Sequence, residues 1–135
     1  LELYNNPANK FVAGFLGSPS MNFLKGKVIK NDISIPSLDK VVFEKKIHLD
    51  KNTSEIIIGV RPHDISLKKS TKGHKIEFVE NLGNVSFCHI KLAENNDLIV
   101  ESDIKKAFKS QDTVKISFNE SDTFIFYNES GKRIK

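Results

Sequence analysis

Eight short runs of strand-like residues follow one another along this chain, with Gly, Asn, Asp and Ser between them. They recur every roughly 10–15 residues, a spacing typical of a β-barrel or β-sandwich. Because neighbouring side chains of a strand point to opposite faces, we expect Ile76 and Phe78 to share one face. The pattern predicts a mainly β fold, with one helical turn near residues 102–108. The runs are Asn22–Ile29, Val41–Ile47, Glu55–Val60, Lys75–Glu80, Asn84–Leu92, Asp97–Glu101, Thr113–Phe118 and Thr123–Tyr127.

Residues 1–20 have a different pattern. Asn6 is suited to cap a helix and Pro7 to begin it. An apolar stripe at helical spacing follows, made of Phe11, Val12, Phe15 and Leu16. Pro19 prevents the helix from continuing. We therefore expect a terminal helix and linker over residues 1–20, belonging to a preceding domain, and a β unit over residues 21–135.

The predicted helix is only about three turns long, and helices of that length are marginal alone in water. We expect its apolar stripe to fold onto the barrel, to pair with a second copy or to fray. The chain opens with Leu1 rather than Met, inside what reads as a structural element. We therefore interpret it as a fragment or excised domain of a longer protein.

The charge pattern argues against a dedicated nucleic-acid binder. The chain carries 21 basic and 17 acidic residues, a net charge of +4, and its only two arginines are Arg61 and Arg133. Arginine is the usual reader of phosphate and guanine, whereas these lysines alternate with acids as on a solvated surface. The apolar runs are far shorter than the ~20 residues that a membrane-spanning helix requires.

Residues that could perform chemistry are few and scattered. No glycine-rich phosphate loop occurs, and the single cysteine, Cys88, is followed directly by His89, so in a strand the two side chains point apart. A metal site built from distant histidines, or Cys88 acting as a nucleophile with a histidine, remains an alternative to a buried, inert cysteine. We therefore name no catalytic, cofactor-binding or metal-binding residue.

Two further features have two interpretations each. His63 follows Arg61 and Pro62, and it is either a polar contact site at a strand edge or part of an exposed turn. The ten Phe residues could stack bases on a barrel surface, although their alternation with aliphatic neighbours favours the core.

Four stretches match the motifs of one family. Two of them are Gly59-Val60-Arg61-Pro62 and Glu80-Asn81-Leu82-Gly83-Asn84. The opening stretch, residues 1–24, includes the string Gly-Ser-Pro-Ser-Met-Asn, and the last is Phe126-Tyr127-Asn128-Glu129-Ser130-Gly131-Lys132-Arg133-Ile134. In their order along the chain, these four stretches closely resemble ABC importer ATPases of the maltose-type sugar and glycerol-phosphate class. His63 and Tyr127 depart from the family, which usually has Glu and Asp there.

The resemblance implies an OB-type β-barrel with additional packed strands, known as the transport-associated OB domain, preceded by one short helix. It implies the regulatory and dimerisation domain of the ATP-binding subunit of an importer for sugars or related solutes, without catalysis of its own. ATP and Mg²⁺ would bind only in a separate nucleotide-binding domain. The implied location is the cytoplasmic side of the membrane.

The resemblance also implies partners. They are a second copy of the subunit, the permease subunits through the nucleotide-binding domain and, as in some relatives, a regulatory protein, with no nucleic acid. The alternative is a stand-alone OB-type domain that binds a small oxyanion or an oligonucleotide. The candidate residues for a partner interface are Phe11, Phe15, Arg61, His63 and Tyr127.

Overall fold

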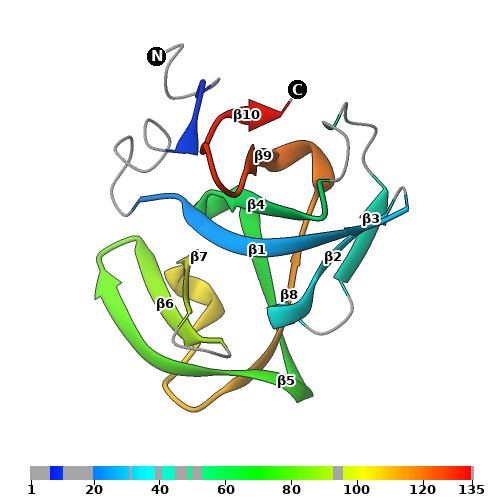
Figure 1. Ribbon diagram of the computed structural model, residues 1–135. Coiled ribbons are helices and arrows are strands. Elements are labelled where there is room, and N and C mark those ends of the chain that lie inside the picture. The colour runs from blue at the N-terminus through cyan, green and yellow to red at the C-terminus, as the bar shows by residue number, and fades with distance from the viewer. Residues whose placement is uncertain are drawn as a thin grey trace. The chain divides into compact units, whose positions relative to one another are not determined.

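Figure 1 shows the computed structural model, which describes residues 7–10, 20–30, 32–38, 41–44, 49, 53–92 and 96–134. The chain divides into two compact units. Unit 1 contains residues 1–60 and 120–135, and unit 2 contains residues 61–119. Each unit is built around an antiparallel sheet, so the predicted mainly β fold is confirmed.

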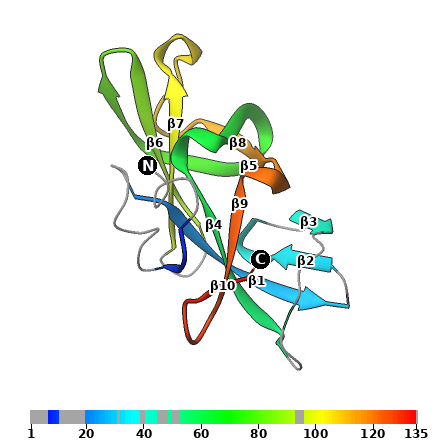
Figure 2. The same cartoon turned by 90° about the horizontal axis from the view of Figure 1, so that it is seen from above.

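Unit 1 holds a six-stranded sheet in the order β10-β9-β4-β1-β2-β3 (Figures 1 and 2). The short 3-10 helix η1 (Pro36–Leu38) follows β2, and η5 (Glu120–Asp122) precedes β9. The strands are β1 (Asn22–Ile29), β2 (Asp32–Ile35), β3 (Val41–Glu44), β4 (Glu55–Val60), β9 (Thr123–Tyr127) and β10 (Arg133–Ile134).

The core of unit 1 lies along β4 and β9, whose apolar residues are buried on both faces. A strand covered on both faces has a continuous apolar run, as in Ile56, Ile57 and Ile58 of β4. Ile57 packs with Met21, Phe124 and Phe126, and Phe23 adds an edge-to-face ring contact to Phe126.

Unit 2 holds a four-stranded sheet in the order β7-β6-β5-β8. Its longest strand has 18 residues, and the first part of this strand pairs with β8 while the last part pairs with β6. One-turn 3-10 helices lie before β5 (η2, Pro62–Asp64) and after β7 (η4, Ile104–Lys106). The strands are β5 (Ile65–Leu82), β6 (Val85–Lys91), β7 (Asp97–Asp103) and β8 (Thr113–Phe118).

A register shift near the middle of β5 changes which face of the sheet its side chains point to. Ile76 is opposite Ile90 on β6, whereas Phe78 is opposite His89, so Glu77 is an extra residue in the pairing. Ile76 is fully buried, and Phe78 is 47% exposed. The prediction that Ile76 and Phe78 share a face is therefore wrong, because the β-bulge interrupts the alternation of the strand.

All eight predicted strands overlap strands of the structure, and η4 confirms the helical turn predicted near residues 102–108. The prediction missed β2, β10 and the first half of β5. Residues 45–47 of the second predicted strand lie outside the described residues, as do residues 11–19 of the leading segment with Phe11 and Phe15. The predicted start of the helix at Pro7 is wrong, because residues 7–9 are not helical and Asn9 forms an isolated β-bridge with Lys132. The rest of the helix and the boundary after residue 20 stay predictions.

Candidate protein-interaction surface

One face of the strands β5, β6 and β7 is apolar and partly exposed. The opposite face of these strands carries the buried side chains Ile76, Cys88, Ile90, Leu98 and Val100. Cross-strand pairing arranges the exposed face in three rows, which we call the outer face. Its rows are Phe78–His89–Ile99, Glu80–Phe87–Glu101 and Leu82–Val85–Asp103.

The outer face contains two of the most exposed large apolar side chains in the described part of the chain. Phe78 is 47% exposed and Leu82 is 55% exposed, while Val85, Phe87 and Ile99 are half-buried. Single exposed apolar residues are common on proteins, but contiguous ones commonly mark interaction sites. The contiguity comes from the pairing of β5 with β6, which aligns the two strands.

The Phe78 and His89 rings are stacked side by side in the first row. Their centroids are 4.1 Å apart and the ring planes differ by 12°. The Nε2 atom of His89 lies 2.5 Å from a carboxylate oxygen of Glu80. Because an ionised carboxylate only accepts hydrogen bonds, this contact favours a proton on Nε2 and fixes the orientation of the ring. The stacked pair is therefore preorganised on a rigid sheet.

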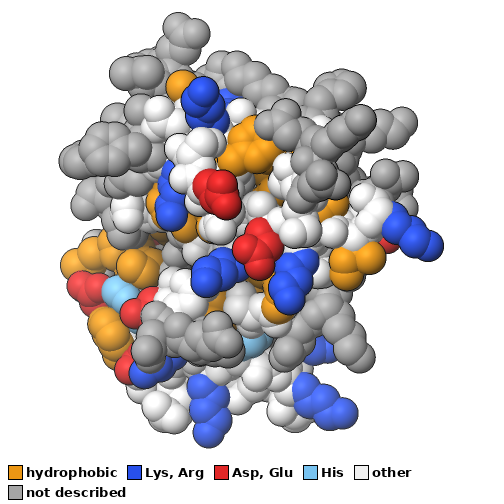
Figure 3. All heavy atoms as spheres, viewed as in Figure 1, with side chains coloured by type: hydrophobic (Ala, Val, Ile, Leu, Met, Phe, Trp, Pro, Cys, Tyr) orange, Lys and Arg blue, Asp and Glu red, His pale blue; other side chains and the backbone are white. Residues whose placement is uncertain are grey.

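The outer face is acidic within a basic chain. Its nine residues include Glu80, Glu101 and Asp103 but no lysine or arginine. In Figure 3, hydrophobic side chains gather with a histidine and acidic side chains on the left of the view, where β5 and β6 lie in Figure 1. An apolar surface with carboxylates around it can bury its centre against another protein while the charges stay near water.

The structure places Arg61 and His63 together at the turn that leads into β5. Arg61 is half-buried, and the N–H of Asp64 donates to its carbonyl oxygen, 3.0 Å away. His63 lies on η2 with a side chain that is 46% exposed, and its Nε2 is 3.6 Å from the Asp64 carboxylate. Neither residue belongs to the outer face.

Tyr127 lies elsewhere, at the end of β9 in unit 1, where it is half-buried and lines a pocket. The sequence-based candidates therefore fall in separate places and none of those that the structure describes lies on the outer face. The alternation of residues 78, 80 and 82 and of residues 85, 87 and 89 was the available signal for that face. It could not be recognised without the bulge and the pairing of the strands.

Cys88 is fully buried on the face opposite His89. Burial, with a smaller contribution from the charge of Asp112, raises the pKa of its thiol to about 11. At neutral pH the thiol is therefore protonated and a poor nucleophile. Within the described ranges, no group of three or more His, Cys, Asp or Glu side chains could hold a metal ion. None of the described helices is long and apolar enough to cross a membrane.

Two family models match the chain. A model described as the MalK OB fold domain matches residues 17–65, and a model described as the TOBE domain matches residues 58–126. A crystal structure of the cytoplasmic molybdate-binding protein ModG with molybdate bound superimposes with a TM-score of 0.60 and 13% identity, covering 77% of this chain and 94% of that chain. At this identity the likeness is one of fold.

Curated relatives are ATP-binding proteins of importers. The chain is 33% identical to the oligosaccharides import protein MsmX of Bacillus subtilis, covering 99% of this chain and 40% of MsmX. It is 28% identical to the sn-glycerol-3-phosphate import protein UgpC of Cereibacter sphaeroides, covering 98% of this chain and 37% of UgpC. For the maltose/maltodextrin import protein MalK of Yersinia pestis, the identity is 39%, over 68% of this chain and 27% of MalK. The chain thus spans at most 40% of the length of these relatives.

Proposed function

The chain belongs to the TOBE domain family, and on that premise we propose that it is the regulatory and dimerisation domain of the ATP-binding subunit of an ABC importer for sugars or related solutes. In this proposal the domain binds proteins and performs no catalysis. ATP and Mg²⁺ bind in a separate nucleotide-binding domain of the same subunit. That other domain contacts the permease subunits on the cytoplasmic side of the membrane.

The observation that carries the proposal is the outer face. It offers exposed apolar side chains on a sheet whose other side is packed, so binding costs little ordering of the protein. In the proposal, the outer face binds a second copy of the subunit. A twofold pair presents the same patch twice, so Phe78 and Leu82 of each copy would be buried in the centre of the contact.

The acidic residues of the outer face allow pairing to be distinguished from the binding of a basic regulatory protein. Two copies would bring Glu80, Glu101 and Asp103 close to their counterparts, and like charges repel. Added salt screens exposed charges, with a Debye length of about 10 Å at 0.1 M. Salt should therefore strengthen a pair formed through this face, whereas it would weaken the binding of a basic partner.

The experiment that tests the proposal compares the full-length subunit with a variant that lacks residues 21–135. Sedimentation at several concentrations, at low and high salt, gives the dimer dissociation constant of each. We expect the deletion to weaken dimerisation more than it changes nucleotide affinity, and salt to tighten the intact dimer. An unchanged dimer constant in the deletion variant would contradict the role in dimerisation.

A second candidate function, binding of a small oxyanion or an oligonucleotide, is favoured by one observation. Lys68 on β5 and Lys115 on β8 are directly opposite each other, and both side chains are exposed. Like charges in this position destabilise a sheet, and an anion between them would relieve the repulsion. Retention on heparin that falls steeply as salt is added would support this candidate. Retention should also be weaker for a Lys68→Ala/Lys115→Ala variant than for the control variant Lys25→Ala/Lys27→Ala on β1.

A further inference from the structure

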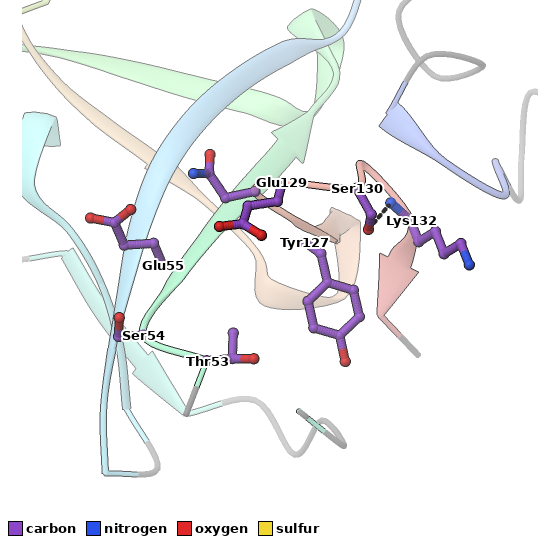
Figure 4. Close-up of a pocket in the computed structure, with 8 residues that line it drawn as sticks. Thr53, Ser54, Glu55, Tyr127, Glu129, Ser130 and Lys132 are labelled. Carbon is purple, nitrogen blue, oxygen red and sulfur yellow. Dashed lines mark hydrogen bonds between the residues drawn. The ribbon is translucent and has the colours of Figure 1, made fainter. Parts of the chain in front are cut away.

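Unit 1 contains a pocket of about 510 Å³ beside Tyr127 (Figure 4). It lies between the residues at the start of β4 and the turn that joins β9 to β10. Ile56 of β4 is paired with Tyr127 of β9, so the sheet itself fixes these two walls relative to each other. The volume falls in the range of roughly 300–1,000 Å³ that is typical of small-molecule sites.

Backbone hydrogen bonds hold the turn that forms one wall. The N–H of Tyr127 donates to the carbonyl of Lys132 at 2.8 Å, and the N–H of Gly131 donates to the carbonyl of Tyr127 at 3.0 Å. Gly131 has a φ of +74°, which glycine adopts without strain. The Ser130 hydroxyl accepts the Lys132 N–H at 3.2 Å, as the dashed line in Figure 4 marks. The wall is therefore preorganised.

Four of the side chains that line the pocket make no hydrogen bond within the described part of the chain, namely Thr53, Glu55, Asn128 and Glu129. Figure 4 shows Thr53, Glu55, Glu129 and Tyr127 around the space, while the ammonium end of Lys132 is directed away from the two glutamates. Neither glutamate makes a hydrogen bond or ion pair with another described residue. The same holds for the side chains of Thr53 and Asn128, which also line the pocket.

The mixture of these groups selects the ligand class. Two carboxylates repel an anion and accept hydrogen bonds from hydroxyl groups. The Asn128 amide donates as well as accepts, and the Thr53 hydroxyl does both, so an ammonium ligand, whose N–H groups only donate, would leave their donors unmatched. A hydroxyl group donates and accepts, and the C–H faces of a sugar ring can lie against an aromatic side chain. We infer that the pocket beside Tyr127 binds a neutral polyhydroxyl ligand of the carbohydrate class.

The chain provides its own reporter for this binding. It contains no Trp and only two tyrosines, Tyr4 and Tyr127. In a Tyr4→Phe variant the tyrosine fluorescence comes from Tyr127 alone. We expect titration with maltose to change this fluorescence saturably, and calorimetry on the unaltered chain to give the same dissociation constant. No saturable response up to about 100 mM maltose by either method overturns the inference, since that limit lies well beyond the millimolar range of weak specific binding. A fluorescence response that saturates with spermidine or phosphate, but not with maltose, also overturns the inference.

Matched variants test the assigned groups. Glu55→Gln/Glu129→Gln in the Tyr4→Phe background should weaken maltose binding at least about tenfold, because charge-assisted hydrogen bonds become neutral ones. Glu120→Gln removes a carboxylate of the same unit outside the pocket lining and should leave affinity unchanged. If the double variant loses its cooperative melting transition, the variant Asn128→Ala is used instead, because Asn128 lies at an exposed turn position. We expect this variant to bind maltose at least about threefold more weakly, since one neutral hydrogen bond is lost. Unchanged affinity in the folded pocket variant overturns the inference. These readouts do not depend on dimerisation.

Discussion

Ile76 and Phe78, two positions apart on β5, lie on opposite faces of their sheet. The extra residue Glu77 turns the strand between them, so Ile76 enters the core and Phe78 stacks on His89. Without this bulge Phe78 would face the same side of the sheet as Ile76, and the outer face would lose the β5 member of its first row. The proposed interaction surface therefore depends on one irregularity in the pairing of β5 and β6.

The exposed apolar side chains of the outer face can be removed without disturbing the core. We predict that Phe78→Ser/Leu82→Ser in the full-length subunit weakens dimerisation at least about tenfold, since truncating a hot-spot residue near the centre of an interface costs about 2 kcal/mol or more. The melting temperature should change little, because both side chains are about half exposed in the single chain. Sedimentation and thermal denaturation measure the two effects. The control Ile29→Ser, on an exposed apolar residue of β1, should leave dimerisation unchanged.

The absence of a glycine-rich phosphate loop from the sequence predicts that this chain neither binds nor hydrolyses ATP. Calorimetry with Mg-ATP should give no saturable heat, and a phosphate-release assay should stay at background. A micromolar dissociation constant with one ligand per chain would contradict the prediction.

The apolar stripe of the predicted helix, made of Phe11, Val12, Phe15 and Leu16, gives a prediction from the sequence alone. Replacing Phe11 and Phe15 with Ser should lower the apparent oligomeric mass or improve solubility, because a contiguous apolar patch promotes association. The β part should melt at nearly the same temperature. If the mass is unchanged and the cooperative transition is lost instead, the segment is an integral part of the core and the boundary after residue 20 is wrong.

The buried thiol of Cys88 predicts a dependence of stability on pH. Its pKa rises from 9.0 to about 11 in the folded chain, so the folded state retains the proton at pH values where the unfolded state releases it. The contribution is complete below pH 9.0 and is lost as pH rises through about 11. Relative to a Cys88→Val variant, the free energy of unfolding should fall by about 2–3 kcal/mol between roughly pH 8.5 and 11.5. Urea denaturation of both proteins at each pH measures the difference, and parallel curves would refute the burial effect.

Two glycines of unit 2 form a matched pair of substitutions. A Cβ at Gly73 would lie 2.1 Å from the Val114 carbonyl oxygen, at the register shift between β5 and β8, and φ there is +149°. Gly83 has a φ of +83°, but a Cβ added there would meet no other atom within 4 Å. We expect Gly83→Ala to cost about 1 kcal/mol from backbone strain alone. Gly73→Ala should cost clearly more, because the backbone of β8 must move, and urea denaturation compares them.

Much of the architecture followed from the sequence because the central strands have strong patterns. The continuous apolar run of β4 and the alternation of β6 and β8 identify strands without any tertiary information. The first half of β5 was missed because most of its residues are exposed, so no alternation marks it. β2 and β10 are short and owe their form to their partners in the sheet.

The candidate surfaces were less predictable than the fold. The motifs, Gly59-Val60-Arg61-Pro62 among them, identified the family, which the TOBE and OB models confirm. A Cβ at Gly59 would lie 2.5 Å from the Met21 sulfur, so a larger residue there would displace that side chain from the core. The outer face and the Tyr127 pocket instead form where separate strands meet. The pattern of residues within one strand does not show which strand it pairs with.

The pairing of β4 with β9 has a consequence for how the protein is made. Val60 is paired with Thr123, so the whole of unit 2 is inserted between two neighbouring strands of unit 1. Unit 2 is a continuous segment, so all of its residues are synthesised before β9. The sheet of unit 1 must wait for its last residues, and until then the isoleucine-rich β4 has an open edge. Such long-range closure is slow, so the nascent chain is most exposed to aggregation just before its final strands emerge.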